Sequence, residues 1–115
     1  LFKTIEKLFP DKNLQGLLCL KGGKDIKNIA KQLQNRFKKL FVSCDRNGYL
    51  MAASDLSKQL DALSIKNIRE NSLRKCIKKL RDDQKPQDII LIFGTHYIAK
   101  EVFEEFEIPF DSVNI

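Results

Sequence analysis

Residues 88–106, DIILIFGTHYIAKEVFEEF, carry the clearest signal for the architecture of this chain. It opens with five apolar residues, Ile89 to Phe93, without alternation of polar and apolar positions. So short a run predicts a strand buried on both faces, as in a parallel sheet covered by helices. Gly94 allows a tight turn, and Thr95 can cap the amphipathic helix predicted to follow. The turn would lie at the carboxyl end of a buried strand, where open α/β sheets bind anionic ligands.

Three further strand–helix units precede this stretch. Strands are expected at residues 14–20, 40–43 and 65–68, and an additional helix at residues 2–9. The helices between the strands are expected to be capped by Asp25, by Ser54, and by Asn71 or Ser72. Phe37 extends the apolar stripe of the first of these helices. Alternating strands and helices predict one α/β domain over residues 1–115, a Rossmann-like three-layer domain with a mostly parallel sheet and helices on both faces.

Size, charge and cysteine content restrict the class of protein. The chain has 115 residues, enough for one domain, and a formal net charge of +6. Its basic residues are interleaved with acidic ones along several helices, which favours solvated helix faces over nucleic-acid binding. The sequence contains neither a long apolar span nor a signal peptide, so no membrane partner is expected. Cys19, Cys44 and Cys76 lack metal-type spacing and are predicted to be reduced, packed thiols of a cytoplasmic protein.

The glycine loop at residues 22–25, GGKD, suggests phosphate binding but fits neither common motif. A P-loop would need glycine at Leu18 and serine or threonine at Asp25. The dinucleotide fingerprint Gly-x-Gly-x-x-Gly is also missing. Lys24 is therefore either a site residue or a solvated lysine, and Asp25 serves at least as a helix cap.

Two other polar residues have a plain structural interpretation. His96 is the only histidine, and no cysteine or carboxylate is paired with it in a recognisable motif, which favours a surface role over catalysis. Arg46 lies in the turn sequence DRNG, where an arginine needs no ligand to explain it. Without a Ser-His-Asp set, a metal-ligand cluster or an obvious acid pair, the sequence predicts no catalytic residue and no metal site.

Together the buried strand, Gly94-Thr95, Tyr97 and the amphipathic helix resemble the last β-α unit of the carboxy-terminal domain of folylpolyglutamate synthase and dihydrofolate synthase. These enzymes belong to the Mur ligase superfamily. The family usually has Gly-Ser at this turn, and Thr95 keeps the hydroxyl. Residues 24–26, Lys-Asp-Ile, match the end of the family's first loop, whereas His96 stands where the family mostly has an apolar residue.

The resemblance implies a cleft at the carboxyl edge of the sheet, with Gly94 and Thr95 holding an anionic group such as the carboxylate of the incoming glutamate. Arg46 lies near a position where family members often carry a basic element. The substrate or nucleotide contacts implied in this way are Lys24, Asp25, Arg46, Gly94, Thr95 and Tyr97.

Family members use ATP and magnesium to convert a carboxylate of dihydropteroate or a folate to an acyl phosphate, which the amine of L-glutamate attacks. This is a step of folate biosynthesis and one-carbon metabolism. ATP and magnesium are bound mainly by a central ATPase domain of the same polypeptide, which is usually a monomer. Because the chain starts at Leu1 and lacks the family's Asp-Gly-Ala-His-Asn strand, we expect it to be an excerpt, inactive as a ligase by itself.

Two alternatives remain open at this stage. The chain is either the equivalent domain of a Mur ligase acting on peptidoglycan precursors, or a free-standing Rossmann-like binding module without catalytic activity. The choice between addition of the first glutamate, extension of a polyglutamate tail, or both is also open.

Overall fold

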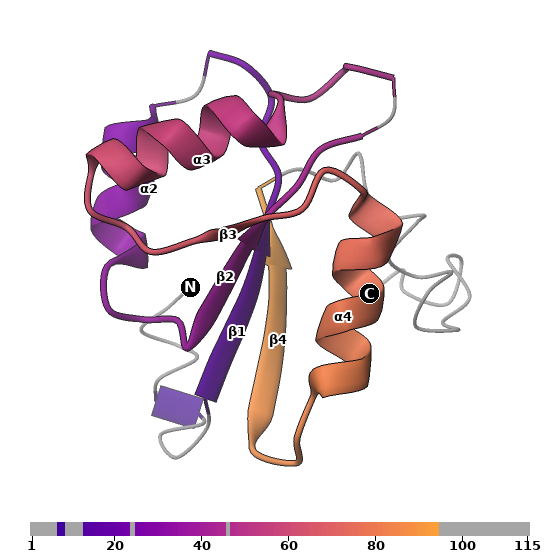
Figure 1. The fold of residues 1–115 in the computed structure, drawn as a ribbon. Helices are drawn as coiled ribbons and strands as arrows, with labels where there is room; N and C mark the ends of the chain where they lie inside the picture. Colours follow the sequence, from indigo (N-terminus) through magenta and orange to yellow (C-terminus); the bar gives the residue numbers. More distant parts are fainter. Residues whose placement is uncertain (1–6, 9–12, 24, 46, 95–115) are drawn as a thin grey trace.

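A computed structural model describes residues 7–8, 13–23, 25–45 and 47–94. In this part of the chain, strands and helices alternate (Figure 1). The elements are β1 (Asn13–Leu18), α2 (Ile26–Leu33), β2 (Lys39–Val42), α3 (Ala53–Ala62), β3 (Ile68–Arg69), α4 (Leu73–Asp83) and β4 (Asp88–Phe93). The helix predicted after Thr95 lies outside the described residues. Of the helix predicted at residues 2–9, only Lys7 and Leu8 are described, and both are helical.

The four strands form one parallel sheet in the order β3-β2-β1-β4. Leu17 of β1 lies between Phe41 of β2 and Ile92 of β4. The chain winds outward from β1 to β3 and then returns to the other side of β1. The strand order therefore reverses between β1 and β4, at a topological switch point.

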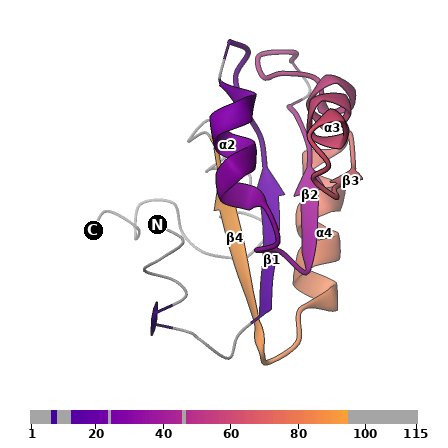
Figure 2. The same cartoon turned by 90° about the vertical axis from the view of Figure 1, so that its left-hand side faces the viewer.

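Helices cover both faces of the sheet, which confirms the predicted three-layer α/β architecture. Leu33 of α2 and Leu56 of α3 share a buried cluster with Leu18 on one face. Ile77 of α4 packs with Leu17 on the other face. Figure 1 shows the sheet between these layers, and Figure 2 shows α2 in front of β1 and β4.

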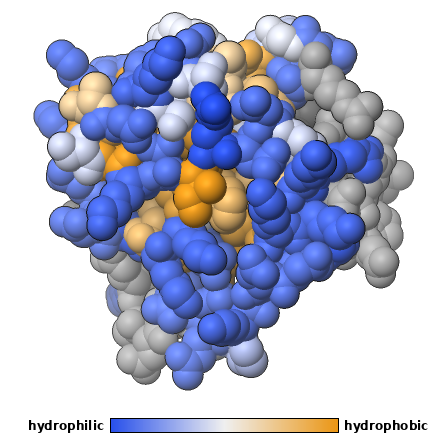
Figure 3. Space-filling model, viewed as in Figure 1, coloured by the Kyte–Doolittle hydropathy of each residue, from blue (hydrophilic) through white to orange (hydrophobic). Residues whose placement is uncertain are grey.

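The predicted strand at Ile89–Phe93 forms as β4, but it is less buried than its sequence suggested. Alternate side chains do pack against the clusters on both faces. All five are nevertheless half-buried, because among the described strands β4 has a neighbour on one side only. The opposite edge, β3, is short and leaves Ile68 42% exposed. Apolar side chains reach the surface between α3 and α4, where this strand lies (Figure 3).

Local side-chain bonds correct several predicted boundaries. Asp25 and Ser72 cap α2 and α4 as expected, each accepting a hydrogen bond from a backbone N–H three residues later. Ser54 does not cap α3, which begins one residue earlier and has no side-chain cap bond. The strand expected at residues 65–68 is β3, displaced to Ile68–Arg69, because the Asn67 amide bonds to the end of α3 instead, donating to Asp61 Oδ1 at 2.8 Å.

Phe37 was predicted on the stripe of α2, but this helix ends at Leu33, and Asn35 takes a left-handed conformation with φ 59°. The Phe37 ring instead stacks on Phe93, with centroids 5.7 Å apart. It lies over the backbone of Gly16, where an added Cβ would stand 2.6 Å from Phe37 Cε1. Glycine in the middle of β1 thus makes room for this ring.

Candidate ligand site at the carboxyl edge of the sheet

The ends of β1 and β4 meet closely at the switch point. Gly94 follows β4 with φ +110°, and a Cβ at this position would collide with the carbonyl oxygen of Cys19. The Cys19 N–H donates to the Phe93 carbonyl at 3.3 Å, which extends the pairing past the end of β1. The predicted tight turn is therefore present, and only glycine fits it.

The loop from β1 to α2 lies beside this turn and is built around its glycines. Gly23 takes a left-handed φ of 83°, and both Gly22 and Gly23 are exposed. Asp25 caps α2: its Oδ1 accepts the Asn28 N–H at 3.3 Å and its Oδ2 accepts the Asn28 side-chain amide at 2.8 Å. The carboxylate of Asp25 is thus committed to the helix start, the structural role predicted for it.

The loop that follows β2 is held by one carboxylate. Asp45 accepts the N–H of Tyr49 at 3.1 Å and the N–H of Leu50 at 2.9 Å. Gly48 completes the turn with φ 72°, which confirms the turn predicted from this sequence. Leu50 is buried, so the loop is anchored in the core just after Tyr49.

The two loops are joined to each other. The Met51 N–H donates to the Leu20 carbonyl at 2.8 Å, and the Lys21 ammonium lies 5.0 Å from the centroid of the Tyr49 ring. Such a cation over an aromatic face is attractive. The carboxyl ends of β1, β2 and β4 therefore form one edge, with the two connected loops on one side and the Gly94 turn on the other.

Of the predicted contacts, Asp25 and Gly94 are described, and both lie on this edge after adjacent strands. The remaining candidates lie outside the described residues: Lys24, Arg46, Thr95 and Tyr97, together with His96. The sequence interpretation missed Lys21 and Tyr49. The available signal was an aromatic residue directly after a turn sequence in the loop that follows a predicted strand.

The described residues contain no group of three or more metal-ligating side chains. At the carboxyl edge, Asp25 and Asp45 already accept backbone N–H groups, which leaves each with less capacity for a cation. Over the described residues, no helix is long and apolar enough to cross a membrane.

The cysteine prediction is confirmed for Cys19 and Cys76, which are buried and not bonded as disulfides. Burial raises the pKa of the Cys76 thiol far above its ordinary value, so this side chain stays protonated. Cys44 is half-buried at the carboxyl edge, with its Sγ 3.6 Å from the Asn71 carbonyl oxygen.

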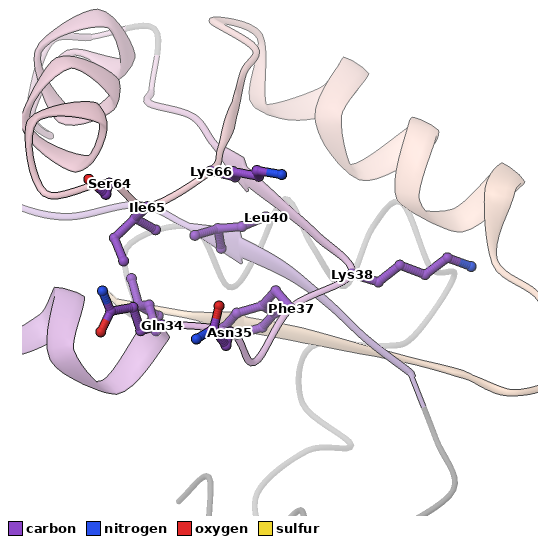
Figure 4. Close-up of a pocket in the computed structure, with 9 residues that line it drawn as sticks. Gln34, Asn35, Phe37, Lys38, Leu40, Ser64, Ile65 and Lys66 are labelled. Carbon is purple, nitrogen blue, oxygen red and sulfur yellow. The ribbon is translucent and has the colours of Figure 1, made fainter.

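Two cavities lie at the opposite, amino edge of the sheet. The larger, about 460 Å³, opens between the carboxyl ends of α2 and α3. In Figure 4 Gln34, Asn35 and Phe37 line one side and Ser64 stands at the other, with Ile65 and Leu40 between them. The smaller, about 290 Å³, is lined in part by Asp88. Neither includes a residue of the predicted cleft.

Asp88 lies at the start of β4 and ties three strands together. Its side chain is 1% exposed, and its Oδ2 accepts the Gln15 amide at 2.7 Å and the Lys85 N–H at 3.0 Å. The Lys38 ammonium lies 4.0 Å from Oδ1. The Lys85 N–H, the Lys38 charge and the Gln15 amide together lower the pKa of Asp88. The network joins β4 to β1 and to the start of β2, which is a structural function.

No protein-family model matches this sequence, and no curated protein sequence matches it either. A solved structure does: the bifunctional folylpolyglutamate synthase/dihydrofolate synthase from Yersinia pestis, in complex with AMPPNP and a Mn ion. The TM-score is 0.73 at 12% sequence identity, and the match covers 93% of this chain but 26% of that enzyme, in its carboxy-terminal domain region. The chain thus spans about a quarter of that enzyme's length. At this identity the likeness is one of fold, and at that level it confirms the resemblance found in the sequence.

Proposed function

We propose that this chain is the carboxy-terminal domain of an ATP-dependent ligase that adds L-glutamate to dihydropteroate or folates through an acyl phosphate. The observation that carries the proposal is the fold match over 93% of the chain, together with a glycine turn at the topological switch point. The neighbouring structure contains AMPPNP and a Mn ion, which supports ATP and a divalent metal as cofactors of the longer enzyme.

The described part of the domain contributes binding groups to this reaction. The left-handed turn at Gly94 and the exposed loop at Gly22-Gly23 present backbone at the carboxyl edge, where an anionic substrate group can approach closely. In the proposal, Lys24 and Thr95 add an ammonium and a hydroxyl to this edge, and Arg46 and Tyr97 contact substrate or nucleotide.

Catalysis requires the partner domain. ATP supplies the phosphoryl group that activates the carboxylate, and the proposed central ATPase domain of the same polypeptide holds it. Closure of the two domains would then bring the glutamate amine to the acyl phosphate and exclude water. Phosphate leaves as the amide bond forms.

The test is an assay of ADP release that depends on dihydropteroate, L-glutamate and magnesium, using the chain joined to its upstream coding sequence. Lys24→Ala and Thr95→Ala are expected to lower kcat/KM about tenfold or more, since each removes a contact to an anionic substrate group. Lys27→Ala, which removes an exposed lysine from α2, is the matched control and should leave kcat/KM unchanged. ADP release by the 115-residue chain alone, or no stimulation of the longer protein by glutamate, would refute the proposal.

A non-catalytic Rossmann-like binding module is the second candidate, because the sequence matches no family model and the structural match has 12% identity. The same assay separates the two. A ligase of peptidoglycan precursors would instead release ADP when a peptidoglycan precursor with a carboxylate replaces dihydropteroate.

A further inference from the structure

We propose that Lys21, Gly22 and Tyr49 form a recognition site for a flat aromatic ring that carries an anionic group. The inference rests on the proposed function only in the choice of probes, since the ligase reaction supplies two such molecules, a nucleotide and a pteridine with a glutamate tail. The shared chemistry is a ring that stacks on Tyr49 and a phosphate or carboxylate that pairs with Lys21.

The first observation is that an aromatic side chain is exposed on an anchored backbone. Tyr49 keeps 57% of its surface exposed although Lys21 lies over its ring. Its backbone N–H and that of the buried Leu50 that follows both donate to Asp45, which anchors this part of the loop. Tyrosine offers a large contact area with few rotatable bonds, so fixing its backbone lowers the entropy lost when a ligand binds.

The second observation is that the described residues give Gly22 no steric or conformational reason to be glycine. Its φ is not positive, and a Cβ added there would meet no atom of the described residues within 4 Å. The other glycine of this loop, Gly23, needs its left-handed φ of 83°. Glycine leaves the backbone without a side chain, which allows a ligand to approach it closely.

The third observation is the charge beside the ring. Lys21 is exposed, and the described acidic side chains of the two loops, Asp25 and Asp45, already accept backbone N–H groups. The ammonium of Lys21 therefore keeps its charge available for an anion, while its position 5.0 Å from the ring centroid places that anion near a stacked ring.

The experiment titrates the 115-residue chain with ATP, folic acid, adenosine and inorganic triphosphate, followed by two-dimensional NMR of the backbone amides. We expect ATP or folic acid to shift the amides of Gly22, Gly23 and Tyr49, and to bind more tightly than adenosine or triphosphate. Tyr49→Leu should weaken this binding by about fivefold or more, the lower limit for loss of a stacked base, whereas Tyr49→Phe should keep it.

Charge and backbone are tested separately. Lys21→Gln should weaken binding, and Lys27→Gln, which lowers the net charge equally, should not. Gly22→Ala should leave the unfolding temperature unchanged or higher but weaken binding by steric interference. Shifts with ATP alone identify a nucleotide site, and shifts with folic acid alone identify a pteridine site.

The proposal is overturned if neither probe shifts these amides up to its solubility limit, or if Tyr49→Leu binds as tightly as the unaltered chain. Ligase activity of the longer protein with an unchanged KM for both substrates in Tyr49→Leu would also overturn it, and would leave the proposed function intact. If the longer protein bound a probe through Tyr49 but had no ligase activity, the proposed function would be refuted and the Tyr49 site would stand.

Discussion

Substitution of Gly16 by alanine tests the packing of Phe37 on β1. The added Cβ would stand 2.6 Å from Phe37 Cε1 and 3.0 Å from Leu40 Cδ1, closer than the van der Waals distance. Overpacking of this kind costs about 1–3 kcal/mol. Replacing glycine within a strand returns about 0.5–1 kcal/mol, since the unfolded chain loses freedom. If the ring moves aside instead, it loses its stacking with Phe93, about 0.5–1.5 kcal/mol.

The expected net effect of Gly16→Ala is therefore a loss of about 0–2.5 kcal/mol, centred near 1 kcal/mol, in the free energy of unfolding. Urea unfolding followed by circular dichroism measures it. Gly22→Ala is the matched control, because a Cβ there meets no atom of the described residues within 4 Å. A background of Phe37→Ala provides the decisive comparison: with the ring removed, Gly16→Ala should become neutral or stabilising. If its cost is the same in both backgrounds, the steric argument is wrong.

Three further predictions follow from caps, charges and burial. Ser64 takes a left-handed φ of 61° just after α3, so Ser64→Gly should raise the free energy of unfolding by about 0.5–1 kcal/mol; an unchanged urea midpoint would contradict this. The folded-state pKa of Asp88 is lowered, so its contribution to stability is present above the ordinary aspartate pKa and is lost as pH falls through the folded value. Asp88→Asn should therefore lower the urea midpoint of unfolding at pH 7, and this midpoint should fall less between pH 7 and pH 3 than it does in the unaltered chain. Equal pH dependence of the midpoint in the two proteins would rule out this role of Asp88. Cys44 should react with a thiol reagent in the native protein, whereas Cys19 and Cys76 should react only on unfolding, as a count of modified thiols with and without urea will show.

Local sequence signals were sufficient for most of the fold. Asp25 and Ser72 cap helices because their side chains bond to N–H groups three residues away, an interaction contained in the sequence itself. The alternation of strands and helices likewise gave the parallel sheet. Ser54 had the same signal, but α3 begins at Ala53, so Ser54 lies inside the first turn and not at the cap position.

Features that depend on distant segments were not predictable in this way. The partial burial of β4 depends on strand order, which periodicity does not contain. The contact of Gly16 with Phe37 depends on how the chain turns after α2. At the site, the Gly94 turn followed from its own sequence, whereas the pair of Lys21 and Tyr49 arises because two loops from neighbouring strands meet.

The position of β4 beside β1 also has a consequence for how the chain folds during synthesis. Strands β1, β2 and β3 pair with neighbours along the sequence, but the bond between Gln15 and Asp88 joins residues 73 positions apart. At a translation rate of about 5–20 residues per second, β1 waits about 4–15 s for this partner. During that time one side of the central strand is an open edge, able to pair with another nascent chain. Binding of a chaperone to this edge, released when residues 88–93 emerge, would protect the chain at its most vulnerable stage.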